Sequence, residues 1–482
     1  MPRRNLYLLV FVLAVSFVSY HKADSANRTH YEPMFDVFKS AMSEIREHYL
    51  YADSVDERKL FEGAMRGMTG ELDPYSGYSG YKETREFDEG LHQEFGGIGI
   101  ELNWNRETKT LSVMSPIVGT PAYEAGIMAG DIITKINDEK TEDFTDSDDA
   151  VNRIKGKPGE PVRLTVIHRG ETQEHELTLV RAKIKVDTVL GDRRNVDGTW
   201  DYTLESNPEI GYIRITQFGD KTVDELGPAL QQCRNKNVRG LVLDLRNDPG
   251  GLLDAAYKVC DYFVSSGIIV TIRERGGRER ERREATGAAQ YTDWPMAVLV
   301  NQYSASASEI VSACLQDHHR AIVVGERSYG KGTVQTPIRL ENGKSMLRLT
   351  IASYWRPSNE NIHRAKGVKE DEKWGVQPDP GYEVKLDEKQ LLQLLRNRRE
   401  RDVLRRPGEK PATPVASATA AGTSDPVPPK PTVPAGGSPP RESSGPRAPT
   451  YVLPDDEENE GESSVDPQLA KAVEYLESKT GK

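Results

Sequence analysis

Apolar residues near the start of the chain recur at the three- and four-residue spacing of an amphipathic helix. Phe35 and Phe38 belong to one such series, and residues 60–68 carry a second one. The two series predict an N-terminal helical region, which we bound at residues 26–90. The cluster LDPYSGYSG (72–80) contains the residue types of tight turns and is expected to end the helical pattern.

Between residues 91 and 181 the pattern changes to short strands separated by glycine turns. The stretch FGGIGIEL (95–102) runs from glycines into a strand, and residues 115–138 have the pattern of a turn, a short helix and a strand. Alternating apolar positions on both sides of an Arg–Gly pair predict a hairpin over residues 162–181. We therefore expect a β-rich domain here.

Residues 182–390 alternate β-branched apolar runs with segments of helical length, such as 222–235 and 252–265. Each run is short and bounded by turn residues, which is typical of strands buried on both faces. The pattern predicts an α/β or α+β core, in which helices flank a buried β-sheet. The predicted strands are residues 210–215, 240–245, 296–301 and 320–325.

Beyond the core, the sequence predicts two helices separated by a linker. A charged amphipathic pattern starts at residue 386, and residues 391–406 form its part outside the core. Residues 407–465 are rich in Pro, Ala and Ser and then in acidic residues, so they contain too few apolar positions to fold and are expected to be a disordered linker. Residues 466–482 begin with a helix-cap signal and carry an apolar stripe, which predicts a helix that docks or pairs.

The first 25 residues have the pattern of an export signal. The opening MPRRN carries two positive charges, and the apolar run 6–20 follows it. Small residues before Ala26 provide a weak cleavage site, and an uncleaved membrane anchor formed by residues 6–20 is the alternative. Either alternative predicts an exported protein, periplasmic or otherwise extracytoplasmic.

Charge and cysteine content exclude several functions. The net charge of −11 argues against a nucleic-acid-binding role, because phosphate neutralisation needs a positive excess. The basic run RERGGRERERRE (273–284) alternates in sign and is therefore expected to be a solvated loop or hairpin. Cys233, Cys260 and Cys314 form no metal-binding pattern and are expected to be buried core residues, although one pair could be bridged in an oxidising compartment. We expect no metal and no cofactor.

The stretch GERSYGKGTVQ (325–335) resembles a phosphate-binding loop, but Gly332 stands where that loop needs a hydroxyl side chain. A nucleotide-binding protein is therefore the weaker interpretation. Lys331 is instead expected on a strand, beside the turn that contains Ser306. A buried lysine shifts its pKa readily and can act as a neutral base. Gln335 is expected on the same strand face, where its side chain can orient the amine.

Ser306 lies where the predicted strand MAVLVN turns into a helix. Together with Glu309 it fits a capping box, which alone implies only a helix start. A serine in this position is also presented at the edge of a sheet, beside the free amides of a helix N-terminus. A Ser–His–Asp arrangement with His318 or His319 is less consistent, because both histidines follow about three helical turns later, roughly 16 Å away.

Glycines near the end of another predicted strand complete this arrangement. The stretch DLRNDPGG (244–251) ends in Gly250 and Gly251. Either glycine amide, together with the amide of Ala307, can form an oxyanion hole for a tetrahedral intermediate.

These motifs occur in the order DLRNDPGG, SASASEI, LQD and RAIVVGERSYGKGTVQ, and they resemble the carboxyl-terminal processing (tail-specific) protease family. The resemblance spans roughly residues 30–390. It implies a Ser–Lys protease core with an inserted PDZ domain, β-rich with two short helices, over residues 91–181. By position it implies Ser306 as nucleophile, Lys331 as general base and Gln335 as its positioning partner. Asp317 of LQD would be a supporting acidic residue, with helix capping or packing as the alternative.

The resemblance also predicts the substrate. FGGIGIEL implies that Gly97, Ile98 and Gly99 bind the C-terminal carboxylate of a protein or peptide with a free apolar C-terminus. The expected function is a serine endopeptidase that cuts near C-termini. A non-catalytic PDZ scaffold is the alternative, and a homodimer formed through the terminal helices is conceivable. Two positions depart from the family pattern, Tyr75 in place of His and Asp248 in place of Asn, and we expect neither to contact the proposed chemistry.

Overall fold

The computed structural model describes residues 31–369, 371–404 and 466–481. The predicted export signal, with its apolar run 6–20, and the predicted linker 407–465 lie outside the described residues. The chain divides into two compact units, of which the second starts at Asp73. Within the described ranges, no helix has both the length and the hydropathy that crossing a membrane requires.

The first unit is helical, as its apolar spacing predicts. Residues 31–48 form a helix, and a short 3-10 turn, η1 (Ala52–Ser54), separates it from α2 (Glu57–Gly70). Asp56 begins α2, because its side chain accepts a hydrogen bond from the amide of Lys59. The turn cluster after Leu72 belongs to the second unit and, unlike the prediction, contains a short strand, β1 (Gly77–Ser79).

A mostly parallel sheet forms the centre of the α/β core. Its strand order is β10-β13-β14-β17-β18, and all pairs except the first are parallel. The four runs predicted as buried strands are four of these five strands. Their bounds are β13 (Ile210–Ile215), β14 (Gly240–Asp244), β17 (Met296–Val300) and β18 (Ile322–Gly325), with β10 (Val189–Leu190) at the edge.

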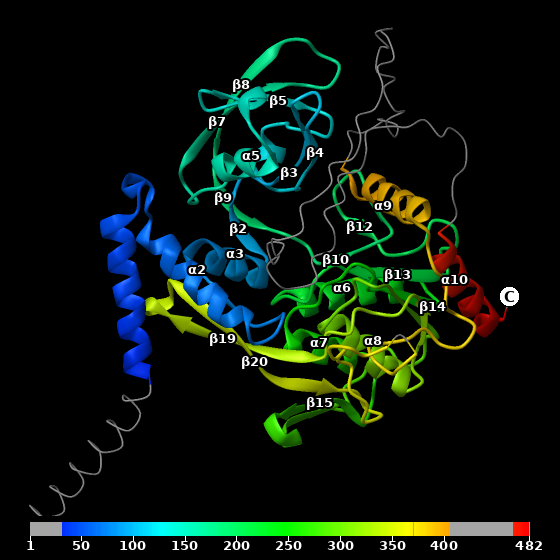
Figure 1. The fold of residues 1–482 in the computed structure, drawn as a ribbon. Helices are drawn as coiled ribbons and strands as arrows, with labels where there is room; N and C mark the ends of the chain where they lie inside the picture. The colour runs from blue at the N-terminus through cyan, green and yellow to red at the C-terminus, as the bar shows by residue number, and fades with distance from the viewer. Residues whose placement is uncertain (1–30, 370, 405–465, 482) are drawn as a thin grey trace, which may run out of the picture. The chain divides into compact units, whose positions relative to one another are not determined.

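Helices cover both faces of this sheet (Figure 1). Alternate residues of β14 point to opposite faces: Leu241 and Leu243 pack into the larger core cluster, and Val242 packs into the smaller one. The larger cluster includes residues of α6 (Thr222–Asn235), α7 (Leu253–Asp261) and α8 (Ala307–Asp317). The three cysteines lie in these helices, buried and free of disulfides.

The C-terminal helix α10 (Pro467–Thr480) covers the other face, where Ala472 and Leu476 are fully buried. Its position is fixed by Arg246, whose buried guanidinium forms ion pairs with Asp244 of β14 and with Asp466, the residue that caps α10. Breaking such a buried pair leaves an uncompensated charge, which is strongly destabilising. The helix predicted at 466–482 therefore docks on the core of its own chain.

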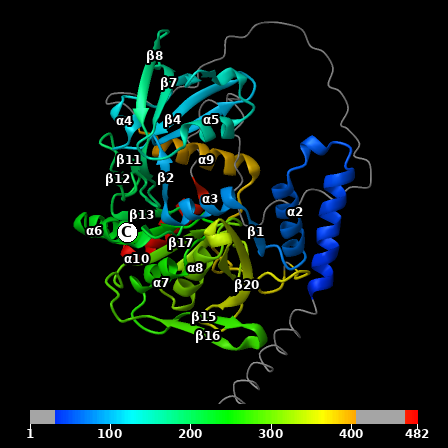
Figure 2. The ribbon, with the colours of Figure 1, turned by 90° about the vertical axis from the view of Figure 1, so that its left-hand side faces the viewer.

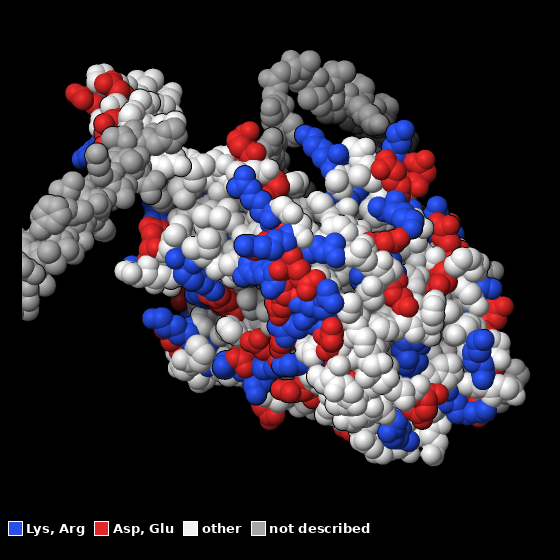
Figure 3. All heavy atoms as spheres, turned by 90° about the horizontal axis from the view of Figure 1, so that it is seen from below, with Lys and Arg blue, Asp and Glu red and all other residues white. Residues whose placement is uncertain are grey.

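A second sheet has the order β1-β20-β15-β16, with β19 also paired to β20. The basic run forms the predicted hairpin: β15 (Ile268–Glu274) and β16 (Glu279–Glu284) are antiparallel. Its arginines pair with nearby glutamates, and on the face seen in Figure 3 the two signs of charge are interleaved. The remaining strands are β19 (Thr333–Leu340) and β20 (Ser345–Trp355).

The β-rich domain has its own sheet, of order β3-β4-β5-β7-β8 with β6 beside β5, and a separate apolar core. The predicted hairpin is β7–β8, and the two helices α4 and α5 lie beside the sheet (Figure 2). Among the strands of the described residues, β3 pairs only with β4, so its other edge is available to a further strand. The bounds are β3 (Ile100–Asn105), β4 (Thr110–Pro116), α4 (Pro121–Glu124), β5 (Ile132–Ile136), β6 (Glu139–Lys140), α5 (Ser147–Ile154), β7 (Pro161–Ile167) and β8 (Glu174–Val180).

Within the described residues, the ribbon of β2 (Glu94–Gly97) and β9 (Ala182–Lys185), the helix α3 (Tyr81–His92) before it and the helix α9 (Glu388–Asp402) connect this domain to the core. α3 leads into β2, which pairs with β9 as a two-stranded ribbon. The predicted charged helix is α9. Asp402 at its end pairs with Arg214 of β13, and the amide of Leu404 donates to the Ser115 hydroxyl of β4. The fold class is therefore as predicted, with an α/β core and an inserted β-rich domain.

Candidate active site

Ser306 occupies a strained turn between β17 and α8. Its backbone φ of 55° and ψ of −110° lie outside the regions that a residue with a Cβ atom normally adopts. Such strain persists only where surrounding contacts over-determine the conformation, and it concentrates at functional sites. Ser306 is only 7% exposed. It lies at the N-terminus of α8, the position that the strand-to-helix pattern predicts.

Glu309 holds this turn and the lysine loop together. One carboxylate oxygen, Oε2, accepts hydrogen bonds from the backbone amides of Ser306 at 2.8 Å and Lys331 at 2.9 Å. The other oxygen, Oε1, accepts from the amide of Gly330 and the hydroxyl of Ser328. The two backbone segments therefore meet at a single oxygen atom. Burial raises the pKa of Glu309 to about 7, although the four donors favour the carboxylate.

These contacts explain the resemblance of GERSYGKG to a phosphate-binding loop. The amides of Gly330 and Lys331 do surround an anion, but the anion is the internal carboxylate of Glu309 rather than a nucleotide. The loop therefore joins two parts of the core, which removes the basis of the nucleotide-binding alternative.

The predicted position of Lys331 on a strand is wrong. β19 begins two residues later, at Thr333, and Lys331 lies in the preceding loop. The reason is that its amide bonds to Glu309 instead of to a neighbouring strand. Burial, and then the nearby positive charge of Arg348, lower the pKa of the Lys331 amine. The amine lies 5.6 Å from the centroid of the Tyr75 ring.

Ser306 and Lys331 are thus brought together through their backbones. In the part of the chain that the structure describes, no hydrogen bond joins the Ser306 hydroxyl to the Lys331 amine. The side chain of Tyr354 is a neighbour of this hydroxyl, and burial raises the pKa of that tyrosine to about 12. Catalytic hydrogen bonds are often long or misaligned before substrate binds, so the resting geometry does not exclude the pair.

Gln335 lies near the beginning of β19, and its amide nitrogen donates to the hydroxyls of Thr333 and Thr350. A β-bulge between Val334 and Gln335 breaks the two-residue alternation that would put Gln335 on the face of Lys331. The expected contact between Gln335 and the lysine amine is therefore not among the hydrogen bonds of the described residues.

The glycines of DLRNDPGG approach the Ser306 turn closely. A Cβ atom on Gly250 would lie 2.8 Å from both the Ala307 amide nitrogen and the Ser306 Cβ, so only glycine fits here. The Gly250 amide, however, donates to Asp248 Oδ1 at 2.8 Å. Gly251, which is exposed, is therefore the candidate oxyanion-hole glycine that does not use its amide in this bond.

Asp317 and His318 lie at the opposite end of α8 from Ser306. The Asp317 carboxylate forms an ion pair with the Arg356 guanidinium, with a shortest separation of 2.6 Å. His318 Nε2 hydrogen-bonds with the backbone carbonyl oxygen of Ile268. The structure therefore places Asp317 in a structural ion pair, and it separates His318 from the candidate nucleophile as the helix length predicts.

The expectation that Tyr75 and Asp248 lie outside the site is wrong. Tyr75 provides the ring beneath the Lys331 amine, and burial together with Tyr329 raises the pKa of the Tyr75 phenol. Asp248 bonds to the Gly250 amide through its side chain and to the Ala305 amide through its carbonyl oxygen. Sequence spacing gave no signal for the Tyr75–Lys331 and Asp248–Ala305 contacts, because both depend on loops that meet only in the folded chain.

In the β-rich domain, Gly97 ends β2, and Ile98 and Gly99 form a buried turn that leads into β3. The carbonyl oxygen of Ile98 accepts a hydrogen bond from the Ala122 amide at the start of α4. Gly99 has a positive φ of 77°, and a Cβ atom there would lie within 2.6 Å of the Thr120 side chain. The turn therefore requires glycine and leads directly to the open edge of β3.

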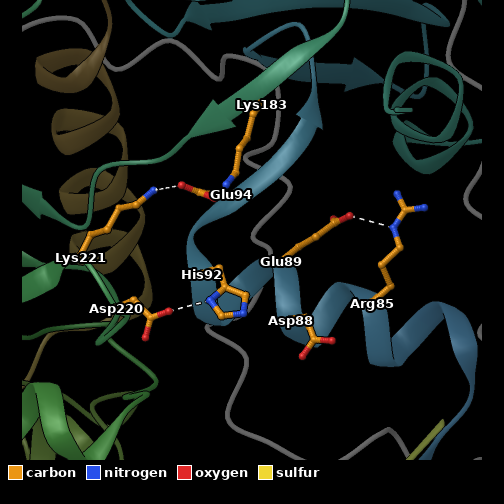
Figure 4. A pocket seen from close by; sticks show the side chains of 8 residues that line it. All are labelled: Arg85, Asp88, Glu89, His92, Glu94, Lys183, Asp220 and Lys221. Atoms are coloured by element: carbon orange, nitrogen blue, oxygen red, sulfur yellow. Dashed lines mark hydrogen bonds and ion pairs between the residues drawn. The ribbon is translucent and has the colours of Figure 1, made fainter. Parts of the chain in front are cut away.

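A cavity of about 530 Å³ lies elsewhere, where α3 and the β2–β9 ribbon approach the start of α6 (Figure 4). Its charged side chains pair with one another: Glu94 contacts Lys183 and Lys221, and His92 contacts Asp220 at 2.6 Å. It contains none of the predicted site residues. The cavity is therefore a paired-charge cluster beside the ribbon rather than the site of the chemistry.

Replacing Glu309 with glutamine tests its connecting role. The Gln side chain keeps one acceptor oxygen and turns an amide group toward two donors, so we expect destabilisation by about 2–4 kcal/mol and a kcat reduced by at least tenfold. Urea unfolding and peptide cleavage measure the two effects. Glu107→Gln, in the exposed turn between β3 and β4, serves as the control. A Glu309→Gln protein with unchanged stability and kcat would show that the carboxylate does not hold the site.

Three family models match the chain. The model described as Peptidase family S41 matches residues 209–374, the PDZ domain model matches residues 96–179, and the model of the activating protease CtpB N-terminal domain matches residues 14–84. The first match contains Ser306 and Lys331, and the second contains the Gly97–Gly99 turn.

Relatives of known name agree with these matches. A carboxy-terminal-processing protease of Bartonella bacilliformis is 38% identical over 368 residues, which cover 73% of this chain and 79% of the relative. A probable CtpA-like serine protease of Staphylococcus epidermidis is 33% identical over 367 residues. The alignment covers 75% of this chain and 70% of the relative. Among solved structures, a photosystem II D1 C-terminal processing protease aligns with a TM-score of 0.40 and 28% identity, covering 71% of this chain and 86% of that one. The chain therefore belongs to the carboxy-terminal-processing proteases, serine peptidases of family S41 that carry a PDZ domain.

Proposed function

We propose that this protein is an endopeptidase that cleaves protein substrates near their C-termini, with Ser306 as nucleophile and Lys331 as general base. The observation that carries the proposal is the shared Glu309 oxygen, which fixes the backbones of both residues at one point. In this proposal, rotation of the lysine side chain brings its amine from the Tyr75 ring to the serine hydroxyl.

The environment of Lys331 supports its role as a base. A lysine accepts a proton only when its amine is neutral, and burial disfavours the charged form. The lowered pKa of Lys331 has this cause, and the positive charge of Arg348 acts in the same direction. The amine would take the proton of the Ser306 hydroxyl as an acyl-enzyme forms and give a proton to the leaving amine.

The developing oxyanion needs donors beside the serine. We place the amides of the exposed Gly251 and of Ala307 in this role, because the Gly250 amide already donates to the Asp248 side chain. Ala307 begins α8, so the partial positive charge at the helix N-terminus adds to the stabilisation. In this proposal, Gln335 donates hydrogen bonds to the hydroxyls of Thr333 and Thr350. It thereby stabilises the start of β19, where the loop that carries Lys331 ends.

The PDZ domain would recognise the substrate C-terminus. We propose that the Gly97–Ile98–Gly99 turn binds the terminal carboxylate through its amides, while the preceding substrate residues add as a strand to the open edge of β3. The apolar side chains of β3, which pack against the PDZ core, favour an apolar substrate end. The N-terminal charge and hydropathy pattern supports export of the enzyme to an extracytoplasmic compartment.

Peptides that differ only at the C-terminus test the proposal. An apolar-ended peptide with a free carboxylate should be cleaved with a KM at least tenfold lower than its amidated form, and Ser306→Ala should cleave neither. Equal KM values would refute carboxylate recognition but leave the peptidase intact. Binding of the free peptide without any cleavage would instead support a non-catalytic PDZ scaffold.

A further inference from the structure

Asp248 presents a buried carboxyl group beside the Ser306 turn. Its side chain is 0% exposed. One oxygen, Oδ1, accepts a hydrogen bond from the Gly250 amide at 2.8 Å, whereas Oδ2 has no hydrogen-bond partner within the described residues. A buried carboxylate without a counter-charge is very costly, so such a group normally becomes neutral instead.

The same residue joins two loops through its backbone. The carbonyl oxygen of Asp248 accepts hydrogen bonds from the Ala305 amide and from the Ser308 hydroxyl, both at 3.0 Å. Ala305 and Ser308 flank the candidate nucleophile. Asp248 thus contacts the glycine turn with its side chain and the serine turn with its main chain.

The neighbouring ionisable groups are already paired elsewhere. On its own loop, Arg246 forms ion pairs with Asp244 and Asp466. On α8, the Glu309 carboxylate accepts its hydrogen bonds from the Ser306 turn and the lysine loop. Burial raises the pKa of Asp248 well above its usual range, and the neutral Gly250 amide bonded to Oδ1 opposes this shift.

We propose that Asp248 is a positioning residue of the peptidase: as a neutral carboxylic acid, it holds the Gly250–Gly251 turn against the Ser306 turn, so that the Gly251 amide faces the oxyanion. This inference rests on the proposed function. Ionisation of Asp248 at high pH places an unpaired negative charge beside the developing oxyanion, which opposes catalysis. We therefore expect activity to decline at alkaline pH in the unsubstituted enzyme, and we assign this expected decline to the Asp248 carboxyl group.

Asp248→Asn tests the assignment, because asparagine keeps the acceptor oxygen and the shape but cannot ionise. At neutral pH its kcat should lie within about twofold of the unsubstituted enzyme, and its kcat should no longer fall as the pH becomes alkaline. Asp248→Ala, which loses the bond to Gly250, should lower kcat by about 10²-fold at every pH with little change in KM, as expected when one oxyanion donor is misplaced. Asp254→Asn, an exposed aspartate on α7, is the matched control and should reproduce the unsubstituted profile.

A stability measurement in the inactive Ser306→Ala background gives a second readout. The folded chain keeps a proton on Asp248 that the unfolded chain releases above the ordinary value of 3.8, so stability falls as pH rises through this window. Adding Asp248→Asn should raise Tm, and by more at alkaline than at acidic pH. A retained alkaline decline in active Asp248→Asn, or a Tm difference that does not change with pH, would overturn the proposal. An unsubstituted enzyme without activity would instead count against the proposed function.

Discussion

Lys331→Met is expected to lower kcat for peptide cleavage by about 10⁴-fold, the upper range for loss of a general base. Methionine keeps most of the apolar stem and loses the amine, and with it the amine's approach to the Tyr75 ring. The backbone amide still bonds to Glu309, and the fold should persist. Single-turnover kinetics with a fluorogenic peptide would separate this loss from substrate binding, which should change by less than about threefold.

Two further variants make the interpretation specific. Lys331→Arg keeps a positive charge but never loses its proton at ordinary pH, so it should be as inactive as Lys331→Met. Lys344→Met, at an exposed turn between β19 and β20, should cleave normally. Activity of Lys331→Arg near that of the unsubstituted enzyme would assign the lysine an electrostatic role rather than proton transfer.

Ser306→Ala is expected to have the larger effect, on the order of a 10⁶-fold loss of kcat, because no covalent intermediate forms. Alanine also has a Cβ atom, so the strained φ of 55° costs the same in both proteins and stability should change little. The Ser306 amide still reaches Glu309. A serine-directed fluorophosphonate should label the unsubstituted protein and not the variant, and mass spectrometry locates the label.

Ser312→Ala is the control for this experiment. Ser312 lies on the same helix, but its buried hydroxyl donates to the backbone carbonyl of Ser308, which makes it a helix-internal group. Normal labelling and cleavage are expected. Labelling of Ser306→Ala at another serine, with activity retained, would move the nucleophile elsewhere.

The fold was largely predictable because its signals are local. Short apolar runs such as MAVLVN, bounded by turn residues, identify buried strands. The turn after that run already placed Ser306 at the start of a helix. The sheet that contains β1 and β20 was not predicted. Its pairings join residues such as Gly77 and Arg348, which lie far apart in sequence and have no local signature.

The candidate site was predictable in its residue types but not in its contacts. Spacing identified Lys331, but the strand assignment failed because the amide of this residue bonds to Glu309. Glu309 was expected only to cap a helix, and its second function depends on a loop more than twenty residues away in the sequence. The contacts of Tyr75 with Lys331 and of the Asp248 carbonyl oxygen with the Ala305 amide were missed for the same reason, since each forms between segments that only tertiary structure brings together.

The most direct test of the Ser–Lys mechanism is to change the basicity of the amine and follow the pH profile. Lys331→Cys should be inactive, and alkylation with bromoethylamine should restore a lysine-like amine, whereas the native cysteines are buried and protected. The sulfur withdraws electrons and makes this amine less basic than lysine. If Lys331 is the base, activity returns and the acidic limb of kcat/KM moves to lower pH. Restored activity with an unshifted limb, or activity before alkylation, would contradict the mechanism.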